Sequence, residues 1–114
     1  TVLYMENMNK DYYGVNTYAT YSGGDFRLQI IKNNMNQKGK KILVVRDSFA
    51  CVTAPFLALQ TSELHICDMR DYEYYVGSKL NMEEYIKEIK PDYVLILYSG
   101  IKDIDNANSR YDFF

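Results

Sequence analysis

Four aliphatic residues in a row, residues 42–45 (ILVV), stop abruptly at Arg46-Asp47-Ser48, and a second apolar stretch, residues 49–60 (FACVTAPFLALQ), begins immediately afterwards. An unbroken run of β-branched and aliphatic residues is typical of a strand that is buried on both faces of a sheet. A buried strand that leads directly into a helix is the first part of a strand–helix–strand unit. This junction therefore directs the chain toward an α/β fold.

The chain beyond this junction continues the alternation. Residues 64–67 (LHIC) form a short predicted strand, and residues 93–97 (YVLIL) form another that is expected to be fully buried. Between them, residues 82–90 (MEEYIKEIK) have apolar side chains at helical spacing, behind Asn81 as a predicted N-cap. Right-handed crossovers give a parallel sheet, with the strand at 42–45 in the middle and the other two on either side. We predict a three-layer α/β sandwich with a parallel sheet.

The remaining segments have shorter patterns. Gly23-Gly24-Asp25 predicts a turn, and alternating apolar and polar residues predict a strand from about residue 26 to 32. Residues 68–79 are expected to form a polar, Tyr-rich loop, and residues 101–114 a surface tail. Residues 1–114 amount to one domain, and the polar opening without an initiator Met predicts the C-terminal part of a longer protein.

Charge and composition argue against several classes of function. The formal net charge is -2, the isoelectric point is about 5.3 and the basic residues are scattered, which argues against nucleic-acid binding. No run approaches the ~18 apolar residues that a membrane span requires. Cys51 and Cys67 lack a metal-site spacing, so two buried, reduced thiols are expected, with a disulfide as the alternative. His65 is the only histidine, and neither a metal nor an organic cofactor is predicted.

Ser48 stands between the predicted central strand and the helix at residues 49–60, which Pro55 should kink or divide in two. As an N-cap, Ser48 would stabilise this helix by about 1 kcal/mol. As a nucleophile, it would have a rigid backbone, nearby N–H donors for an oxyanion, and a position where open α/β sheets bind ligands. The spacing leaves both interpretations open.

Residues 42–58 (ILVVRDSFACVTAPFLA) resemble the nucleophile block of the SGNH hydrolase superfamily, in which Gly-Asp-Ser follows the first strand; here Arg46 stands in place of the Gly. Four segments in order, SGGDFRLQIIKNN, KKILVVRDSFACVTAPFLA, LHICDMRDYEYY and PDYVLILYSG, together resemble the DHHW family. This bacterial branch of SGNH-like proteins is similar to the alginate O-acetyltransferases, which modify exported polysaccharides. The resemblance covers about residues 20–100. It implies that Ser48 is the catalytic nucleophile and that Asp47 is structural, with hydrogen bonds to the backbone near the turn.

The resemblance also implies that the Asp-x-His pair that activates Ser48 lies upstream, because this chain contains neither Asp-x-His nor Asp-His-His-Trp. His65 falls within a predicted strand, so we interpret it as a strand histidine that faces a neighbouring helix or the far edge of the sheet. The chain alone is therefore expected to be catalytically incomplete.

An SGNH esterase usually supplies a Gly N–H and an Asn side chain as oxyanion donors after its second and third strands. Here those positions hold Asp68-Met69-Arg70 and Tyr98-Ser99-Gly100, which leaves the Ser48 N–H as the safest donor. The candidate oxyanion and substrate-binding residues are Arg70, Ser99, Gly24, Tyr72 and Tyr74, and the tyrosines are suited to stacking on pyranose rings. The alternative for Arg70 is a salt bridge to Asp68 or Asp71, and the alternative for Gly24 is an ordinary tight turn.

Two functions follow from these observations. The first is the serine-bearing part of an SGNH-like esterase or O-acetyltransferase that acts on cell-envelope polysaccharide through an acyl-serine. The second is a non-catalytic carbohydrate- or protein-binding module of the same fold, which the missing Asn and the presence of Arg46 favour. A flavodoxin-like domain would need a more polar phosphate loop than RDSFACVTAP. The expected partner is an acetylated carbohydrate or cell-envelope glycan, and the resemblance implies an extracytoplasmic or cell-surface location.

Overall fold

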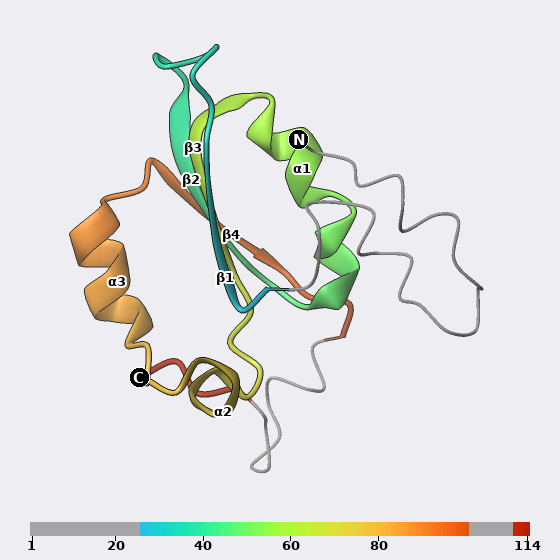
Figure 1. Cartoon of the computed structure of the whole chain (residues 1–114), viewed down its shortest axis with the longest axis vertical. Helices are drawn as coiled ribbons and strands as arrows, with labels where there is room; N and C mark the ends of the chain where they lie inside the picture. Colours follow the sequence, from blue (N-terminus) through green and yellow to red (C-terminus); the bar gives the residue numbers. More distant parts are fainter. Residues whose placement is uncertain (1–25, 101–110) are drawn as a thin grey trace.

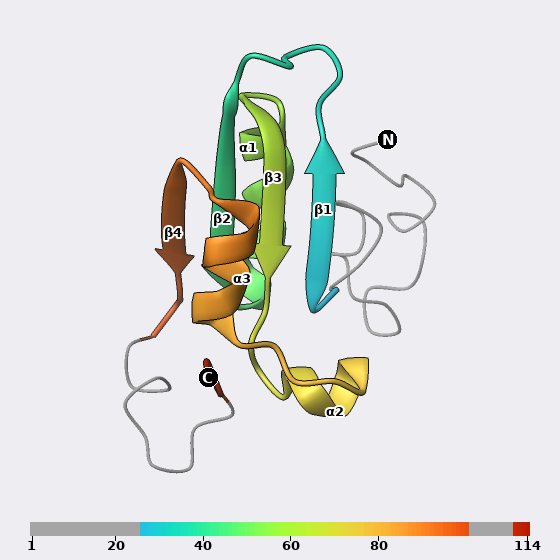
Figure 2. The ribbon, with the colours of Figure 1, turned by 90° about the vertical axis from the view of Figure 1, so that its left-hand side faces the viewer.

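Strands from distant parts of the chain form one sheet in the computed structural model, which describes residues 26–100 and 111–114 (Figures 1 and 2). Within these residues the order of the strands is β1-β3-β2-β4, and their bounds are β1 Leu28–Lys32, β2 Lys40–Arg46, β3 Thr61–Cys67 and β4 Tyr93–Leu97. β2 pairs in parallel with both β3 and β4, whereas β1 pairs antiparallel with β3. The fold is α/β with a mostly parallel sheet, and the strand that precedes Ser48 lies between two parallel neighbours, as predicted.

Helices lie on both faces of this sheet (Figure 2). Their bounds are η3 Ser48–Cys51, a 3₁₀ helix, α1 Ala54–Ala58, α2 Tyr72–Val76 and α3 Met82–Ile89. On one face, α1 packs against Val44, Leu64 and Ile66. On the other face, α2 and α3 pack against Leu43, Val45 and Cys67. Alternate residues of β2 thus enter different cores, which is why its apolar run is unbroken.

The junction after β2 differs from the expected single helix. Pro55 divides the segment, as predicted, and lies in the first turn of α1, where its missing N–H costs no helical hydrogen bond. The N-cap of η3 is Asp47 instead of Ser48: Asp47 has an extended backbone, and its side chain accepts a hydrogen bond from the Phe49 N–H at 3.0 Å. The N-cap interpretation of Ser48 is therefore wrong, because a carboxylate one residue earlier occupies that role.

β4 was expected to be fully buried, and this prediction is wrong. The exposed fractions of its apolar side chains are 56% for Tyr93, 41% for Val94 and 68% for Ile96. β4 lies at the edge of the sheet among the described residues, and α3 packs over β2 and β3 instead of β4 (Figure 2). An apolar sequence predicts burial only when another element covers the strand.

The helix and loop that follow β3 are partly as predicted. Asn81 caps α3 by accepting a hydrogen bond from the Glu84 N–H at 3.0 Å, and the apolar side of α3 packs against the core. The loop expected at residues 68–79 instead contains α2, which Asp71 (φ 48°) and Gly77 (φ 82°) bound with left-handed backbone. Gly77 suits this conformation because it has no side chain.

The last residues of the chain are not a simple surface tail. Tyr111 and Phe113 pack against the core beside α3, and the Met82 N–H donates to the Phe113 carbonyl at 2.8 Å. The surface-tail prediction is therefore wrong for Tyr111 and Phe113, whereas Asp112 and Phe114 are exposed; residues 101–110 lie outside the described residues. The predicted turn at Gly23-Gly24-Asp25 also lies outside them.

Candidate functional site at the carboxyl end of the sheet

Ser48 lies two residues beyond the carboxyl end of β2 and is partly exposed. The connection from β2 to β3 passes α1 on one face of the sheet, whereas the connection from β3 to β4 passes α3 on the other. After β2 the chain therefore turns to one face of the sheet, and after β3 it turns to the opposite face. Open α/β sheets bind ligands at such a switch point.

Asp47 fixes the turn that carries Ser48. Its side chain is buried, and Oδ1 accepts from the Phe49 N–H at 3.0 Å while Oδ2 accepts from both the N–H and the hydroxyl of Ser99 at 2.7 Å. The Asp47 N–H donates in turn to the Leu97 carbonyl at 3.3 Å. These bonds join the end of β2 to the end of β4 across the switch point, and they include the backbone hydrogen bonds expected of Asp47.

A surface cavity of about 270 Å³ lies beside this turn. Its lining includes the residues on both sides of Ser48 and the end of β4: Asp47, Phe49, Ala50, Thr53, Leu97, Tyr98 and Ser99. The walls are mostly apolar, and Asp47 and Ser99 supply polar groups. A cavity of this size and lining could hold a small acyl group next to position 48.

Burial by itself raises the pKa of Asp47, but the hydrogen bonds from Ser99 and Phe49 and the positive charge of Arg70 together lower it below its usual value of 3.8. A carboxyl whose pKa is lower in the folded state stabilises the fold above the unfolded-state pKa. This stabilisation is lost as the pH falls through the folded-state value.

We therefore predict that Asp47→Asn lowers the free energy of unfolding at pH 7 by about 1–3 kcal/mol, because an amide accepts fewer and weaker hydrogen bonds than a carboxylate. The difference from the wild type should shrink as the pH is lowered below about 4. Urea unfolding at several pH values measures both effects. A difference that does not change with pH would contradict the role of the charged carboxylate.

A fully buried carboxylate, Asp68, lies just after β3 and contacts three guanidinium groups. Arg70 approaches it with Nη2 at 2.5 Å and Nε at 3.0 Å, Arg27 with Nη1 at 2.8 Å, and Arg46 with Nη1 at 3.6 Å. Arg46, which replaces the usual Gly of the nucleophile block, is itself buried and donates to the Phe26 carbonyl at 2.8 Å. Of the alternatives for Arg70, the salt bridge to Asp68 is thus present.

The other candidate residues have different surroundings. Ser99 lies next to the Ser48 turn, but its hydroxyl donates to Asp47. Tyr72 is 7% exposed and packs in the core with Met69, so little of its ring is available for stacking on a sugar. Tyr74 is 84% exposed and remains available for stacking. Gly24 lies outside the described residues.

Arg27 was missed from the sequence although it joins this site. Arg27 precedes β1, which pairs antiparallel with β3, and it therefore lies beside the carboxyl end of β3. Its guanidinium lies 4.3 Å from the ring centre of Tyr75. Residues 27 and 68 are far apart in the chain, and only the β1–β3 pairing brings them together. No pattern of neighbouring residues in the sequence indicates that Arg27 and Asp68 are in contact.

His65 is a buried strand histidine, as predicted, and its ring faces α3. Nε2 lies 2.6 Å from Glu63 Oε1, and Nδ1 lies 2.6 Å from the Tyr85 hydroxyl. The hydrogen bond from His65 lowers the pKa of Glu63, and burial raises the pKa of Tyr85 to about 12. The carboxylate of Glu63 can only accept, so Nε2–H donates to it, and Nδ1 shares a hydrogen bond with the Tyr85 hydroxyl. His65 pairs with Leu43, roughly 15 Å along the strand from Ser48.

We predict that Tyr85→Phe lowers the free energy of unfolding by about 1–2 kcal/mol, because the buried Nδ1 of His65 then lacks its hydrogen-bond partner. Tyr93→Phe, which removes an exposed hydroxyl on β4, should change it by less than about 0.5 kcal/mol. Chemical denaturation of the two variants gives the comparison. Equal effects would show that the hydrogen bond from Tyr85 contributes no stability.

Three further observations concern metal ligands, membrane-spanning helices and cysteines. In the described ranges, 26–100 and 111–114, no cluster of three or more metal-ligating side chains occurs. No helix in the same ranges combines the length and hydrophobicity needed to cross a bilayer. Cys51 and Cys67 are both buried free thiols, as expected.

Comparison with solved structures identifies proteins with a similar fold. A structure of PatB1 from Bacillus cereus matches with a TM-score of 0.70 and 28% identity over 98% of this chain and 33% of that chain. A structure of PatB1 with a sulfonyl adduct matches with a TM-score of 0.59 and 32% identity over 72% of this chain and 27% of that chain. A DHHW family protein from Eubacterium siraeum has a TM-score of 0.60 and 22% identity over 86% of this chain and 28% of that chain, a likeness of fold alone.

These matches confirm the resemblance to SGNH-like proteins and the DHHW family that the sequence predicted. The chain spans about a third or less of the length of the matched chains. No protein-family model and no curated protein matches the sequence.

Proposed function

Because the chain is distantly similar in structure to the PatB1 O-acetyltransferase, we propose that it is the serine-bearing part of an SGNH-like esterase or O-acetyltransferase. The proposed substrate is a cell-envelope polysaccharide, and Ser48 is the proposed nucleophile. The observation that carries the proposal is the position of Ser48, on a turn at the switch point that the buried Asp47 fixes through Phe49 and Ser99.

In the proposed reaction, the Ser48 hydroxyl oxygen attacks the carbonyl carbon of an acetyl ester while a base takes its proton. The carbonyl electrons move onto oxygen and form a tetrahedral oxyanion. When the intermediate collapses, the bond to the donor alkoxide breaks, and the alkoxide takes up the proton. The resulting acetyl-serine is then attacked by water in hydrolysis or by a sugar hydroxyl in transfer, which regenerates Ser48.

The backbone N–H of Ser48 is the proposed oxyanion donor. The next two N–H groups of η3 are engaged, since the Phe49 N–H donates to the Asp47 carboxylate and the Ala50 N–H donates to the Asp47 carbonyl at 3.2 Å. Arg70 is close enough to lower the pKa of Asp47, so its positive charge also favours an oxyanion near this turn.

The base in this proposal is not among the 114 residues of the chain. His65 is the only histidine of the chain, and Glu63 and Tyr85 bind both of its ring nitrogens at a distance from Ser48. The resemblance implies an Asp-x-His pair upstream of the serine. The 114-residue chain alone should therefore hydrolyse acetyl esters very slowly.

The sulfonyl adduct in a matched PatB1 structure supports a nucleophilic mechanism, because activated side-chain nucleophiles react with sulfonyl groups.

We also propose an extracytoplasmic or cell-surface location, since the proposed substrate belongs to the cell envelope. Cell fractionation followed by immunoblotting of the full-length gene product tests the location.

The proposed activity is tested by incubating the full-length gene product with p-nitrophenyl acetate and with acetylated glycans. Release of p-nitrophenol or of acetate, or transfer of acetyl to a glycan hydroxyl, is the expected result.

The alternative function is a non-catalytic binding module. It is favoured by Arg46 in place of Gly and by a Ser99 hydroxyl that already donates to Asp47. Glycan binding without release or transfer of acetyl would support that alternative.

A further inference from the structure

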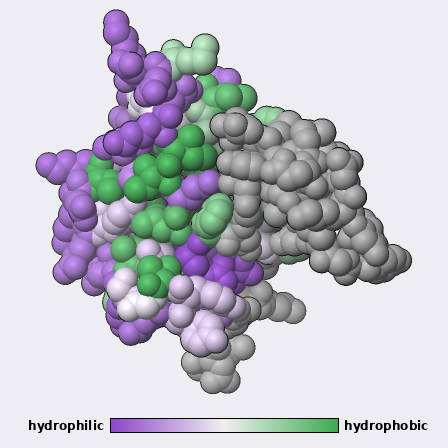
Figure 3. Space-filling model, in the orientation of Figure 1, coloured by the Kyte–Doolittle hydropathy of each residue, from purple (hydrophilic) through white to green (hydrophobic). Residues whose placement is uncertain are grey.

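Arg46 is a charged side chain in the interior of the protein, although it lies just two residues before Ser48. Charged side chains normally stay in water, as those on the hydrophilic surface of α3 do (Figure 3). Arg46 is only 2% exposed. A guanidinium in a protein interior has to be held by hydrogen bonds, because burial of a charge otherwise costs free energy. The groups to which Arg46 donates therefore indicate its role.

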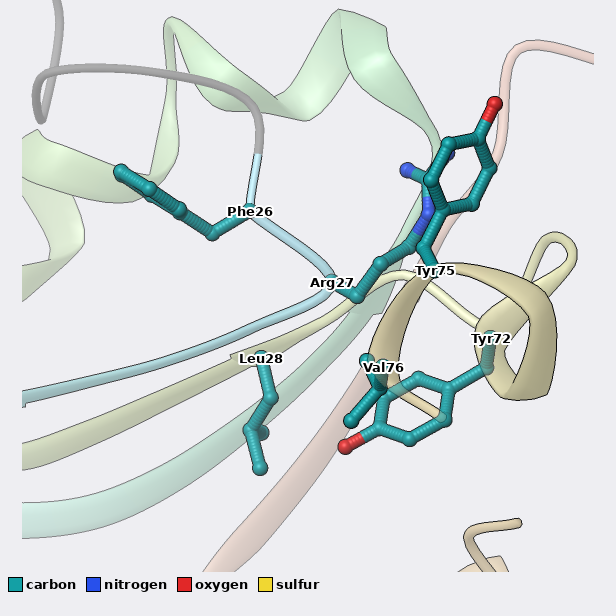
Figure 4. Close-up of a pocket in the computed structure, with 6 residues that line it drawn as sticks. All are labelled: Phe26, Arg27, Leu28, Tyr72, Tyr75 and Val76. Atoms are coloured by element: carbon teal, nitrogen blue, oxygen red, sulfur yellow. The ribbon is translucent and has the colours of Figure 1, made fainter. Parts of the chain in front are cut away.

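The Arg46 guanidinium donates to two backbone carbonyls from different parts of the chain. Nη1 donates to the Asp47 carbonyl at 3.3 Å, and Nη2 donates to the Phe26 carbonyl at 2.8 Å. Nη1 also lies 3.6 Å from the Asp68 carboxylate. Phe26 and Arg27 directly precede β1, and their side chains point to opposite sides (Figure 4). Arg46 thus links the turn after β2 to the residues before β1.

The contact with Asp47 involves the peptide unit between Asp47 and Ser48. The carbonyl of this unit belongs to Asp47, and its N–H is the Ser48 N–H, which is the proposed oxyanion donor. The same carbonyl also accepts from the Ala50 N–H at 3.2 Å. Because a peptide unit is rigid and planar, two donors that hold its carbonyl also hold the direction of its N–H.

Donors on the carbonyl also strengthen the N–H at the other end of the peptide unit. Hydrogen bonds in a chain polarise one another, and each strengthens the next by about 10–30%. The donor here is a charged guanidinium, and charge-assisted hydrogen bonds are stronger than neutral ones. The Ser48 N–H should therefore stabilise an oxyanion better than the N–H of a peptide unit that lacks this donor.

The position of Arg46 at the end of β2 allows this contact. Side chains alternate along a strand, so Arg46 points to the face of the sheet on which Val44 packs against α1. The chain from Ser48 leads into α1 on that same face. The Gly of the nucleophile block that this chain resembles has no side chain, so it could not donate to the carbonyl of the next residue.

We propose that Arg46 is a positioning residue for acyl transfer. Its guanidinium orients and polarises the Asp47–Ser48 peptide unit, so that the Ser48 N–H stabilises the oxyanion more strongly. Arg46 acts through this peptide unit and does not touch the substrate. The role in acyl transfer rests on the proposed function of Ser48, whereas the contact of Arg46 with the Asp47 carbonyl does not.

Kinetics of the full-length gene product with p-nitrophenyl acetate test this role through Arg46→Met, which removes the donors and keeps a long side chain. An oxyanion forms both when Ser48 is acylated and when the acyl-serine is hydrolysed. We therefore expect kcat to fall about tenfold whichever step is slower, with KM nearly unchanged, whereas removal of an oxyanion donor itself costs about 10²–10³-fold. Wild-type kcat in Arg46→Met, or a rise in KM alone, would overturn the proposal.

Two further variants separate positioning from stability. Tyr85→Phe also removes a buried hydrogen bond, but it does so at His65, away from Ser48, and should keep wild-type kcat. An equal loss of kcat in Tyr85→Phe would assign the effect to the stability of the fold and overturn the proposal. Arg46→Lys keeps a cation beside Asp68 without the planar fork of donors, and it carries the same test if Arg46→Met does not fold.

NMR of the ¹³C,¹⁵N-labelled 114-residue chain measures the contact without catalysis. Loss of a hydrogen bond to a carbonyl moves its ¹³C resonance upfield, so Arg46→Met should shift the Asp47 carbonyl carbon and the Ser48 amide nitrogen upfield. Both resonances should stay in place in Tyr85→Phe. Arg46→Lys should keep kcat only as far as it keeps these resonances, and recovery of one without the other would overturn the proposal.

The failure of this proposal can be told apart from the failure of the proposed function. An active wild type together with unchanged kcat in Arg46→Met would reject the role of Arg46 alone. A wild type without acyl transfer would reject the proposed function, and the role of Arg46 in catalysis with it, even where the Asp47 resonance shifts.

Discussion

Replacement of Ser48 by Ala should lower kcat/KM of the full-length gene product for acetyl esters by at least about 10³-fold, because it removes the hydroxyl that we propose forms the acyl intermediate. The free energy of unfolding should change by less than about 1 kcal/mol, since Asp47 caps η3 and the Ser48 side chain is partly exposed. Steady-state kinetics and urea denaturation together measure the two effects.

The matched control is Ser78→Ala, which removes an exposed hydroxyl from the loop after α2. We expect unchanged kinetics for this variant. If Ser48→Ala kept more than about a tenth of the wild-type activity, Ser48 would not be the nucleophile, and another group would have to form the covalent intermediate.

The largest effect on stability is expected for Asp68→Asn. Asp68 is fully buried, and its carboxylate contacts Arg27, Arg46 and Arg70. Loss of the carboxylate places a neutral amide among three guanidinium groups, so the free energy of unfolding should fall by about 3–5 kcal/mol. Thermal or urea unfolding of the 114-residue chain measures the change.

Asp92→Asn is the control for this experiment, because Asp92 is exposed where its carboxylate accepts from Lys40 and from the Lys41 N–H. We expect it to lower the free energy of unfolding far less than Asp68→Asn does, because solvent screens an exposed ion pair. If both variants lose the same stability, the buried cluster around Asp68 is not what holds the loop after β3 to the start of β1.

The sequence was sufficient to predict most of the sheet because the relevant signals are local. The unbroken apolar run identified β2, and helical spacing behind Asn81 identified α3. Strand–helix–strand alternation then determined that β3 and β4 flank β2 in parallel. Pro55 correctly marked the division between η3 and α1.

The errors arose where tertiary contacts override a local pattern. β4 is apolar on both faces, yet no described element covers Ile96. Ser48 has a residue type typical of an N-cap, but Asp47 caps η3 by accepting from the Phe49 N–H, and Ser99, just after β4, holds the same carboxylate in place. Tyr72 looked like one of several loop tyrosines, whereas α2 turns its ring into the core.

The candidate site was predicted only in part for the same reason. Ser48, Asp47 and Ser99 belong to motifs that can be recognised in the sequence, and the structure brings them together at one turn. Arg27 belongs to no motif and reaches Asp68 through the pairing of β1 with β3. Residue types at fixed spacing could not have predicted that contact.

The central claim is that Ser48 is the nucleophile of an acyl-transfer enzyme, and covalent labelling tests it most directly. The full-length gene product is treated with phenylmethylsulfonyl fluoride, and the modified peptide is identified by mass spectrometry. We predict one sulfonyl group on Ser48, absent in Ser48→Ala, with loss of activity in proportion to labelling. Full inactivation with the sulfonyl group on any other residue, or full activity after Ser48 is labelled, would contradict the account.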